Sequence, residues 1–254
     1  MRFFFFILVL FLGPTQILYA SSRGDVKILE ATENIQYLSQ KITKDYFFFY
    51  RNPKDLFLQK QLNQNLEKIQ YSIDEIKGIS NTQNNNNNNL LEYLSYKAKK
   101  IKEIINQKKN LSNAIHVLDY TEVILEGAQS IAKKHTYEFS EDEKMLMTSK
   151  EIQYLLERSV KYYIAMQIGL NSSSSLEKLE YAIIDIDKHL TNIESYHYPY
   201  IFKLKLNKVK GAWQTNRDFL TKANETSIPY LLLNSTQYIE NLLQEIEEYH
   251  KKNL

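Results

Sequence analysis

The 254-residue chain contains no cysteine, and it has only six glycines and four prolines. The lack of cysteine excludes disulfide bonds, thiolate catalysis and attachment of a lipid at a cysteine. The sequence has no glycine-rich phosphate loop and no Gly-x-Ser-x-Gly or His-Glu-x-x-His motif. Basic and acidic side chains nearly balance, at a net charge of +2, which leaves no basic surface for nucleic acid. We therefore expect a protein that is not an enzyme, needs no cofactor or metal and binds no nucleic acid.

The N-terminus has the layout of a secretory signal peptide. Met1-Arg2 carries positive charge, residues 3–12 are all apolar, and Gly13-Pro14 follows before Ala20 at the expected cleavage site. An uncleaved membrane anchor is the alternative, but the apolar run is well short of the roughly 20 residues that span a bilayer. No second apolar segment follows. We therefore expect residues 1–20 to be removed and the mature protein to be periplasmic or secreted, without stable membrane insertion.

Apolar residues recur at spacings of three and four along nearly the whole chain, which predicts an all-α fold. Residues that start or stop helices divide the chain into segments. Asn52-Pro53 is expected to open a second helix that runs to Gly78, and the polar run 81–89 is expected to connect it flexibly to a third. Two further helices are expected at 90–109 and 111–135. A capping box of Ser140 and Glu143 is expected to open the next helix, which runs to about Gly169. Three more helices are expected to begin at a cap formed by Ser174 and Glu177, at Pro199 and at Pro229.

The second half of the chain repeats the first. Tyr37-Leu38 recurs as Tyr154-Leu155, and the apolar row of the second predicted helix recurs in the same register. Because each copy spans about half of the chain, the repeated unit is a whole domain and not a solenoid unit. We therefore expect two tandem up-and-down four-helix bundles, one over residues 21–138 and one over residues 139–254. The two rows that we expect to be buried are Leu62, Leu66, Ile69, Ile73 and Ile76, and Leu179, Ile183, Ile186, Leu190 and Ile193.

A short motif lies in the first predicted helix of each copy. Residues 38–46 read Leu-Ser-Gln-Lys-Ile-Thr-Lys-Asp-Tyr, residues 155–163 are a weaker version, and Trp213 lies in the third predicted helix of the second copy. These features resemble the N-terminal sensory domain of type IV pilus methyl-accepting chemotaxis transducers, the PilJ/NarX-like family. The resemblance implies an extracytoplasmic four-helix sensory module in which displacement of a helix reports a bound ligand.

The chain departs from this family at one functional position. The first arginine of the family's motif, on the helix where nitrate-sensing members hold the anion, is replaced by Gln36 and Gln153. The second cationic position is kept, as Lys41 and Arg158. Glutamine donates hydrogen bonds without charge, and a neighbouring cation adds charge-assisted ones. We therefore expect a small polar or anionic ligand to bind along the first helix of the two copies, at Gln36, Gln40, Lys41, Gln153 and Arg158.

Two functions from different classes follow from these features. The main expectation is an exported, non-enzymatic sensory or ligand-binding protein that acts as a soluble partner of a membrane receptor in a chemotaxis or pilus system. The sequence ends at Leu254 without a membrane exit or a kinase, so a protein partner is expected, either a receptor or a second copy. The alternative is a structural or interaction factor of the cell envelope that has no small ligand and uses its 19 tyrosines and the aromatic cluster at residues 47–50.

A metal-binding bundle is a weaker alternative. Glu194 with His197, and Glu247 with His250, have the spacing that places a carboxylate and an imidazole on one helical face. Both pairs fall in the last turns of their predicted helices, and residues 200–208 carry no carboxylate. Because a di-metal centre needs four carboxylates that project inward from mid-helix, we expect neither pair to bind a metal.

Overall fold

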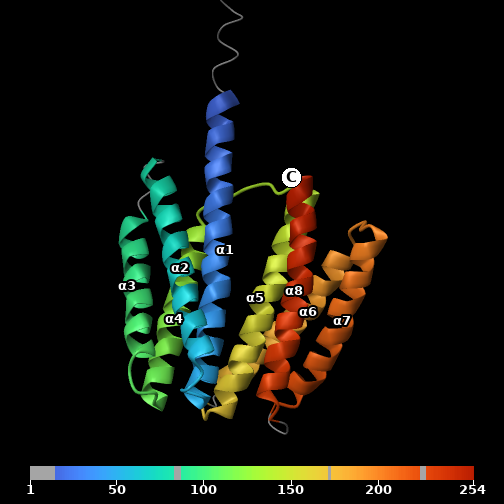
Figure 1. The fold of residues 1–254 in the computed structure, drawn as a ribbon. Coiled ribbons are helices and arrows are strands. Elements are labelled where there is room, and N and C mark those ends of the chain that lie inside the picture. The colour runs from blue at the N-terminus through green and yellow to red at the C-terminus, as the bar shows by residue number, and fades with distance from the viewer. Residues whose placement is uncertain (1–14, 83–86, 171–172, 224–226) are drawn as a thin grey trace, which may run out of the picture.

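The computed structural model describes residues 15–82, 87–170, 173–223 and 227–254 (Figure 1). Within these ranges the chain forms eight α-helices and no strand, so the predicted all-α fold is confirmed. The helices are α1 (Thr15–Arg51), α2 (Leu56–Thr82), α3 (Asn88–Ile105), α4 (Leu111–Ala132), α5 (Glu141–Gln167), α6 (Ser173–Glu194), α7 (Tyr200–Thr221) and α8 (Pro229–Asn253).

The helices form two groups of four that lie side by side (Figure 1). In the first group α1 and α3 each pack against α2 and α4, and in the second α5 and α7 each pack against α6 and α8. Helices α1 and α5 also pack against each other and so join the two groups. Val160, Ile164 and Ala165 of α5 belong to the apolar cluster of the first group, so the two cores meet along α1 and α5. A boundary between two domains at residue 138 stays a prediction.

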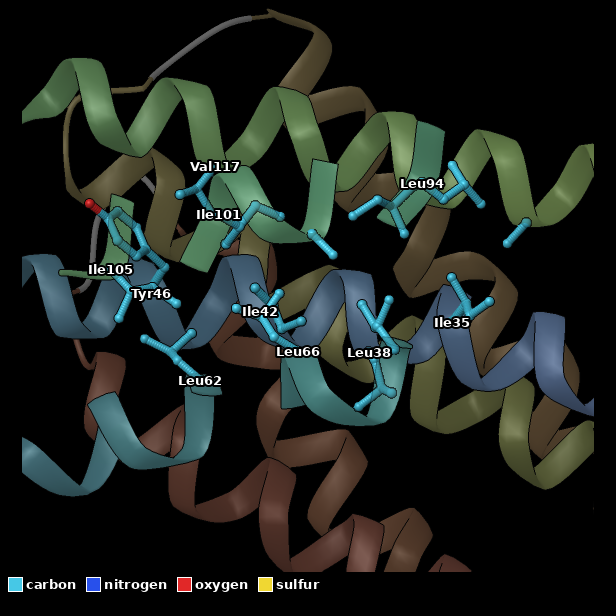
Figure 2. Packing of buried hydrophobic residues seen from close by; sticks show 14 of the residues in the cluster. Ile35, Leu38, Ile42, Tyr46, Leu62, Leu66, Leu94, Ile101, Ile105 and Val117 are labelled. Atoms are coloured by element: carbon cyan, nitrogen blue, oxygen red, sulfur yellow. The ribbon is translucent and has the colours of Figure 1, made fainter. Parts of the chain in front are cut away.

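The repeated apolar rows are buried in both groups. All five residues of the row on α2 and all five of the row on α6 are at most 5 % exposed, as predicted from their spacing. Figure 2 shows Leu66 of α2 beside Leu38 and Ile42 of α1, all within one cluster. Every residue from 42 to 49 is buried, because α1 is covered by α2, α4 and α5. The apolar periodicity therefore sets the packing in both copies.

The same contact between an aspartate and a histidine is found in both groups of helices. His135 Nδ1 lies 2.7 Å from Asp25 Oδ1, and His250 Nδ1 lies 2.7 Å from Asp142 Oδ1. The register of the repeat aligns the two aspartates with each other and the two histidines with each other. Both imidazoles are buried. The duplication thus extends from the apolar cores to the contact that ties the first helix of each copy to the end of the fourth.

The start of α2 differs from the prediction. The helix begins at Leu56 and not at Asn52-Pro53. Asp55 Oδ1 accepts hydrogen bonds from the N–H groups of Phe57 and Leu58, both at 3.1 Å, so Asp55 is the residue that satisfies the free N–H groups of the first turn. The Asp55 N–H donates to the Asn52 carbonyl at 3.1 Å, which places Pro53 in a turn before the helix.

Gly78 does not end α2, which continues to Thr82. A glycine ends a helix where it adopts a left-handed conformation, and among the described glycines only Gly169 does so, with φ +87°. After α5 the Gly169 N–H donates to the Met166 carbonyl and the Leu170 N–H donates to the Ala165 carbonyl. These are the two bonds of a Schellman motif, so the predicted end near Gly169 is confirmed and the predicted end at Gly78 is wrong.

Other predicted ends move by a few residues. Helix α3 ends at Ile105 and not at Lys109. The Lys109 ammonium donates to the carbonyls of Ile105 and Gln107 and so satisfies carbonyls at the end of the helix. Helix α6 begins at Ser173, so Ser174 lies inside it and is not its N-cap. The capping box of Ser140 and Glu143 is present at α5, and Pro229 opens α8 as predicted. Helix α4 ends at Ala132 and not at His135, and α7 begins at Tyr200, directly after Pro199. Helix α3 begins at Asn88, which lies within the predicted connection. Residues 83–86 of that connection lie outside the described residues.

The expected leader falls largely outside the described residues, which begin at Thr15. Helix α1 starts there, and its first turns project beyond the other helices (Figure 1). Cleavage after Ala20, which would fall within these turns, stays a prediction. In the part of the chain that the structure describes, no helix combines the length and the apolar character needed to cross a bilayer.

Candidate functional site

A cavity of about 220 Å³ lies between α1, α5 and α8. We call it the seam cavity, because α1 and α5 are the helices that join the two groups. Asn34 and Gln244 are exposed and mark its solvent side, whereas Gln153 and Tyr154 are buried. The residues that line it are Glu33, Asn34, Gln36 and Tyr37 of α1, Lys150, Glu151, Gln153 and Tyr154 of α5, and Gln244 and Glu247 of α8.

The duplication creates most of this lining. In the register of the repeat, Gln36 aligns with Gln153 and Tyr37 aligns with Tyr154. The other four positions that α1 and α5 contribute also align in pairs, with different side chains in the two copies. The cavity therefore forms where the first helix of one copy faces the same stretch of the first helix of the other. Only α8 adds residues without a partner from α4.

Carboxylates dominate the charge around the cavity. Glu33, Glu151 and Glu247 line it, and the only cationic side chain in its lining is Lys150. Glu33 Oε2 lies 4.0 Å from Lys150 Nζ. This oxygen is buried and accepts no hydrogen bond from any residue that the structure describes. Burial, which Lys150 only partly offsets, raises the pKa of Glu33 to about 8.

Glu247 is the second acidic group with an altered pKa. It accepts a hydrogen bond from the Gln153 amide, and its other oxygen lies 3.9 Å from Lys251 Nζ. Burial raises the pKa of Glu247, while Lys150 and Lys251 act in the opposite direction. The cavity thus holds two acidic side chains whose pKa is raised by burial more than the neighbouring lysines lower it.

Next to the cavity, a buried ion cluster ties α1 to α5 and α8. Lys41 Nζ lies 2.6 Å from Glu157 Oε1 and 3.2 Å from Glu240 Oε2. Lys44 Nζ lies 2.7 Å from Glu157 Oε2. The Tyr37 hydroxyl, whose ring lines the cavity, donates to Glu240 Oε1 at 3.0 Å. The cluster connects the cavity wall to the interior of the seam.

The charged groups of this cluster shift each other's pKa values. Burial alone would raise the pKa of Glu157, but Lys41 and Lys44 together outweigh it and lower that pKa to about 2. For Lys41, burial opposes the charge, and Glu157 and Glu240 outweigh it and raise its pKa. Burial and the neighbouring Glu157 raise the pKa of Glu240. Glu157 therefore stays ionised between two lysines.

The structure separates the five residues expected to bind a ligand. Gln36 and Gln153 both line the seam cavity. Gln40 is buried and donates to Ser39 Oγ at 3.2 Å, Lys41 is held by the ion cluster, and Arg158 Nη1 donates to the Tyr154 hydroxyl at 2.9 Å. The two glutamines thus converge on one cavity, while the two cations are engaged by groups of the protein. A ligand role for the five residues stays a prediction.

The Glu-x-x-His pairs do not come together. His197 is exposed, and His250 is buried with Nδ1 2.7 Å from Asp142 Oδ1 and Nε2 2.6 Å from the Tyr198 hydroxyl. Both ring nitrogens of His250 therefore have partners. Among the residues that the structure describes, no group of three or more His, Asp or Glu side chains is placed to hold a metal ion.

Comparison with models of protein families, with curated proteins and with solved structures finds no match for the chain. The class that the fold and the site define is an all-α protein with a partly polar cavity at the junction of its repeated helices.

The cavity carboxylates predict an unusual pH dependence of stability. Because the pKa of Glu33 is raised from 4.5 to about 8 on folding, the folded state binds more protons than the unfolded state between these values. The contribution of Glu33 to the free energy of unfolding is therefore full below pH 4.5 and falls as the pH rises toward 8. Urea unfolding at pH 5, 6.5 and 8 should show a steeper decline for the wild type than for Glu33→Gln. The exposed control Glu248→Gln should keep the wild-type slope, and equal slopes for all three proteins would exclude a raised pKa at Glu33.

Proposed function

We propose that the protein is an exported, non-enzymatic sensory protein that binds a small polar ligand in the seam cavity and acts together with a membrane receptor. The single observation that carries ligand binding is the convergence of Gln36 and Gln153, aligned residues of the two copies, on one cavity. The leader-like N-terminus supports export. The resemblance to the PilJ/NarX-like family supports a sensory role and a receptor as the partner.

The size of the cavity limits the ligand. A cavity of about 150 Å³ holds benzene, so a volume of about 220 Å³ suits a molecule of roughly nine non-hydrogen atoms. Amide groups from Gln36, Gln153 and Gln244 offer both donors and acceptors. This lining suits a polar metabolite and not a large apolar molecule.

A ligand in this position would act on the contact between the two groups of helices. It would touch α1 and α5 at once, and these helices belong to different groups. A ligand stabilises the arrangement of two states to which it binds more tightly. Binding would therefore favour one placement of α1 relative to α5, and the receptor would recognise the surface that this placement creates.

A thermal-shift screen of small polar metabolites against the purified wild type tests the proposal. A ligand present at about 100 times its Kd should raise the Tm by about 5 °C or more. We expect at least one compound of roughly nine non-hydrogen atoms or fewer to do so. If no compound does so, the structural or interaction role without a small ligand becomes the better account.

A further inference from the structure

The charge of the seam cavity favours a ligand of one sign. Glu33, Glu151 and Glu247 face Lys150 as the only cation in the lining, and the other lining residues are neutral amides and tyrosines. A bound anion would disfavour ionisation of these three carboxyl groups. A bound cation would favour their ionised form, in a partly buried place where water screens charge less than at the surface.

One carboxylate oxygen of Glu33 lacks a hydrogen-bond donor among the described residues. This atom, Oε2, is buried. The nearest cation, Lys150 Nζ, is 4.0 Å away, which is longer than a charge-assisted hydrogen bond. A buried carboxylate oxygen without a donor is costly. An ammonium group bound in the cavity would supply the missing donor.

Three other cations of α1 and α5 are engaged by groups of the protein. Lys41 and Lys44 are held by Glu157, and the Arg158 guanidinium donates to the Tyr154 hydroxyl. None of the three lines the cavity. Among the described residues, an incoming cation would therefore compete with Lys150 at Glu33 and with Lys251 at Glu247.

The aromatic part of the lining agrees with a cation. The hydroxyl groups of Tyr37 and Tyr154 are already hydrogen-bonded, to Glu240 and to Arg158. What these two residues add to the cavity is mainly their ring surface. Aromatic rings attract ammonium and guanidinium groups, and Lys41 Nζ already lies 5.3 Å from the centre of the Tyr37 ring.

Resting on the proposed function, we propose that the ligand of the seam cavity is a small organic cation, a primary amine with one or two ammonium groups, held by the carboxylates of Glu33 and Glu247. The ammonium donates hydrogen bonds to the free oxygen of Glu33. The glutamine amides complete its coordination. The ligand thereby links α1 to α8 across the face of α5.

Calorimetric titration with three probes of similar size tests the sign of the charge. The probes are 1,4-diaminobutane, 1-butanol and butyrate, titrated into the wild type at pH 7.5. We expect binding of the diamine only. Glu33→Gln and Glu247→Gln should each weaken diamine binding at least tenfold, whereas the neighbouring exposed control Glu248→Gln should bind as the wild type. Circular dichroism of each variant checks that it is folded.

Proton release gives a second readout that a purely structural role would not change. The charged groups around Glu33 are Glu30 of the same helix, Lys150 and Glu151 of α5 and Glu247 of α8. A bound ammonium would lower the pKa of Glu33 from about 8, so binding at pH 7.5 should release protons. Titrations in two buffers of different ionisation enthalpy measure this release, and it should be lost in Glu33→Gln.

The possible failures are distinguishable. Binding of butyrate or butanol but not of the diamine would overturn the cationic ligand and leave ligand binding in place. A screen hit that is neutral or anionic, together with no binding of the diamine, would have the same meaning. Failure of all three probes and of the whole screen would overturn the proposed function itself. Diamine binding that is unchanged in both Glu33→Gln and Glu247→Gln would place the amine outside the seam cavity.

Discussion

Ile183→Asp is expected to lower the free energy of unfolding by at least about 3 kcal/mol. Ile183 lies in the buried row of α6 and is only 5 % exposed. Aspartate at this position would place an unpaired charge among aliphatic side chains, at a cost well above that of lost apolar contact alone. Urea unfolding followed by circular dichroism measures the change.

The next residue is a matched control for this variant. Ile184 is 61 % exposed, so Ile184→Asp makes the same chemical change in the same helical turn without burying a charge. We expect it to alter stability by no more than about 0.5 kcal/mol. Leu66→Asp, in the corresponding row of α2, should behave like Ile183→Asp. If the two isoleucine variants were equally stable, the packing face assigned to α6 would be wrong.

Glu157→Gln is expected to lower the free energy of unfolding by a similar amount, about 3–5 kcal/mol. The loss comes from a buried charge and not from apolar packing. The substitution removes the charge that holds both Lys41 and Lys44, and the side chain of Lys44 is only 4 % exposed. Lys41 would keep Glu240 at 3.2 Å and Lys44 would keep Asp45 at 3.3 Å, but the carboxylate that both share would be lost. Removing one charge from a buried cluster is far more costly than the loss of a surface ion pair. Urea unfolding at pH 7 measures the effect.

A surface pair provides the control for Glu157. Glu92 lies 3.3 Å from Lys77 but is 67 % exposed, and Glu92→Gln should cost well under about 1 kcal/mol. In the wild type, the stabilisation from Glu157 should be complete above pH 4.5 and be lost as the pH falls toward 2, because folding lowers its pKa from 4.5 to about 2. An equal small loss in both variants would show that the buried cluster contributes no more than a surface pair.

The features that local sequence predicts well are those that depend on neighbours in the chain. The apolar rows of α2 and α6 follow from a spacing of three and four, and the capping box at Ser140 and Glu143 follows from two residues three positions apart. Both are present in the structure. Where two capping residues compete, as Asn52 and Asp55 do before α2, the spacing alone does not decide, because Asp55 is selected by two N–H groups of the first turn.

The ion cluster could not be predicted in the same way. Lys41, Lys44 and Glu157 are charged side chains, which are mostly exposed in proteins unless they are paired. The local spacing does not reveal their partners, because these lie on helices that are distant in sequence. The pairing of Lys41 with Glu157 and Glu240 joins residues from α1, α5 and α8. Helices α5 and α8 pack within the second group, and the packing of α1 against α5 brings the two lysines to their carboxylates.

Some residues of the candidate site could be predicted from the sequence and others could not. The resemblance to the PilJ/NarX-like motif pointed to Gln36 and Gln153, because they stand where that motif has its first arginine in the two copies. The repeat did not point to Glu33 or Glu247, since their positions in the other copy carry Lys150 and Ala132. A site at the junction of two repeats breaks their symmetry, so residues unique to one copy contribute to it.

The seam cavity itself is tested most directly by blocking it. Gln36→Trp places a large ring at a half-buried position in the lining, whereas Gln129→Trp makes the same change at a half-buried position of α4 that does not line the cavity. Calorimetric titration of the ligand found in the screen should show binding to the wild type and to Gln129→Trp with similar Kd, and binding to Gln36→Trp weakened at least tenfold. Wild-type affinity in a folded Gln36→Trp variant would contradict the assignment of the ligand to the cavity between α1, α5 and α8.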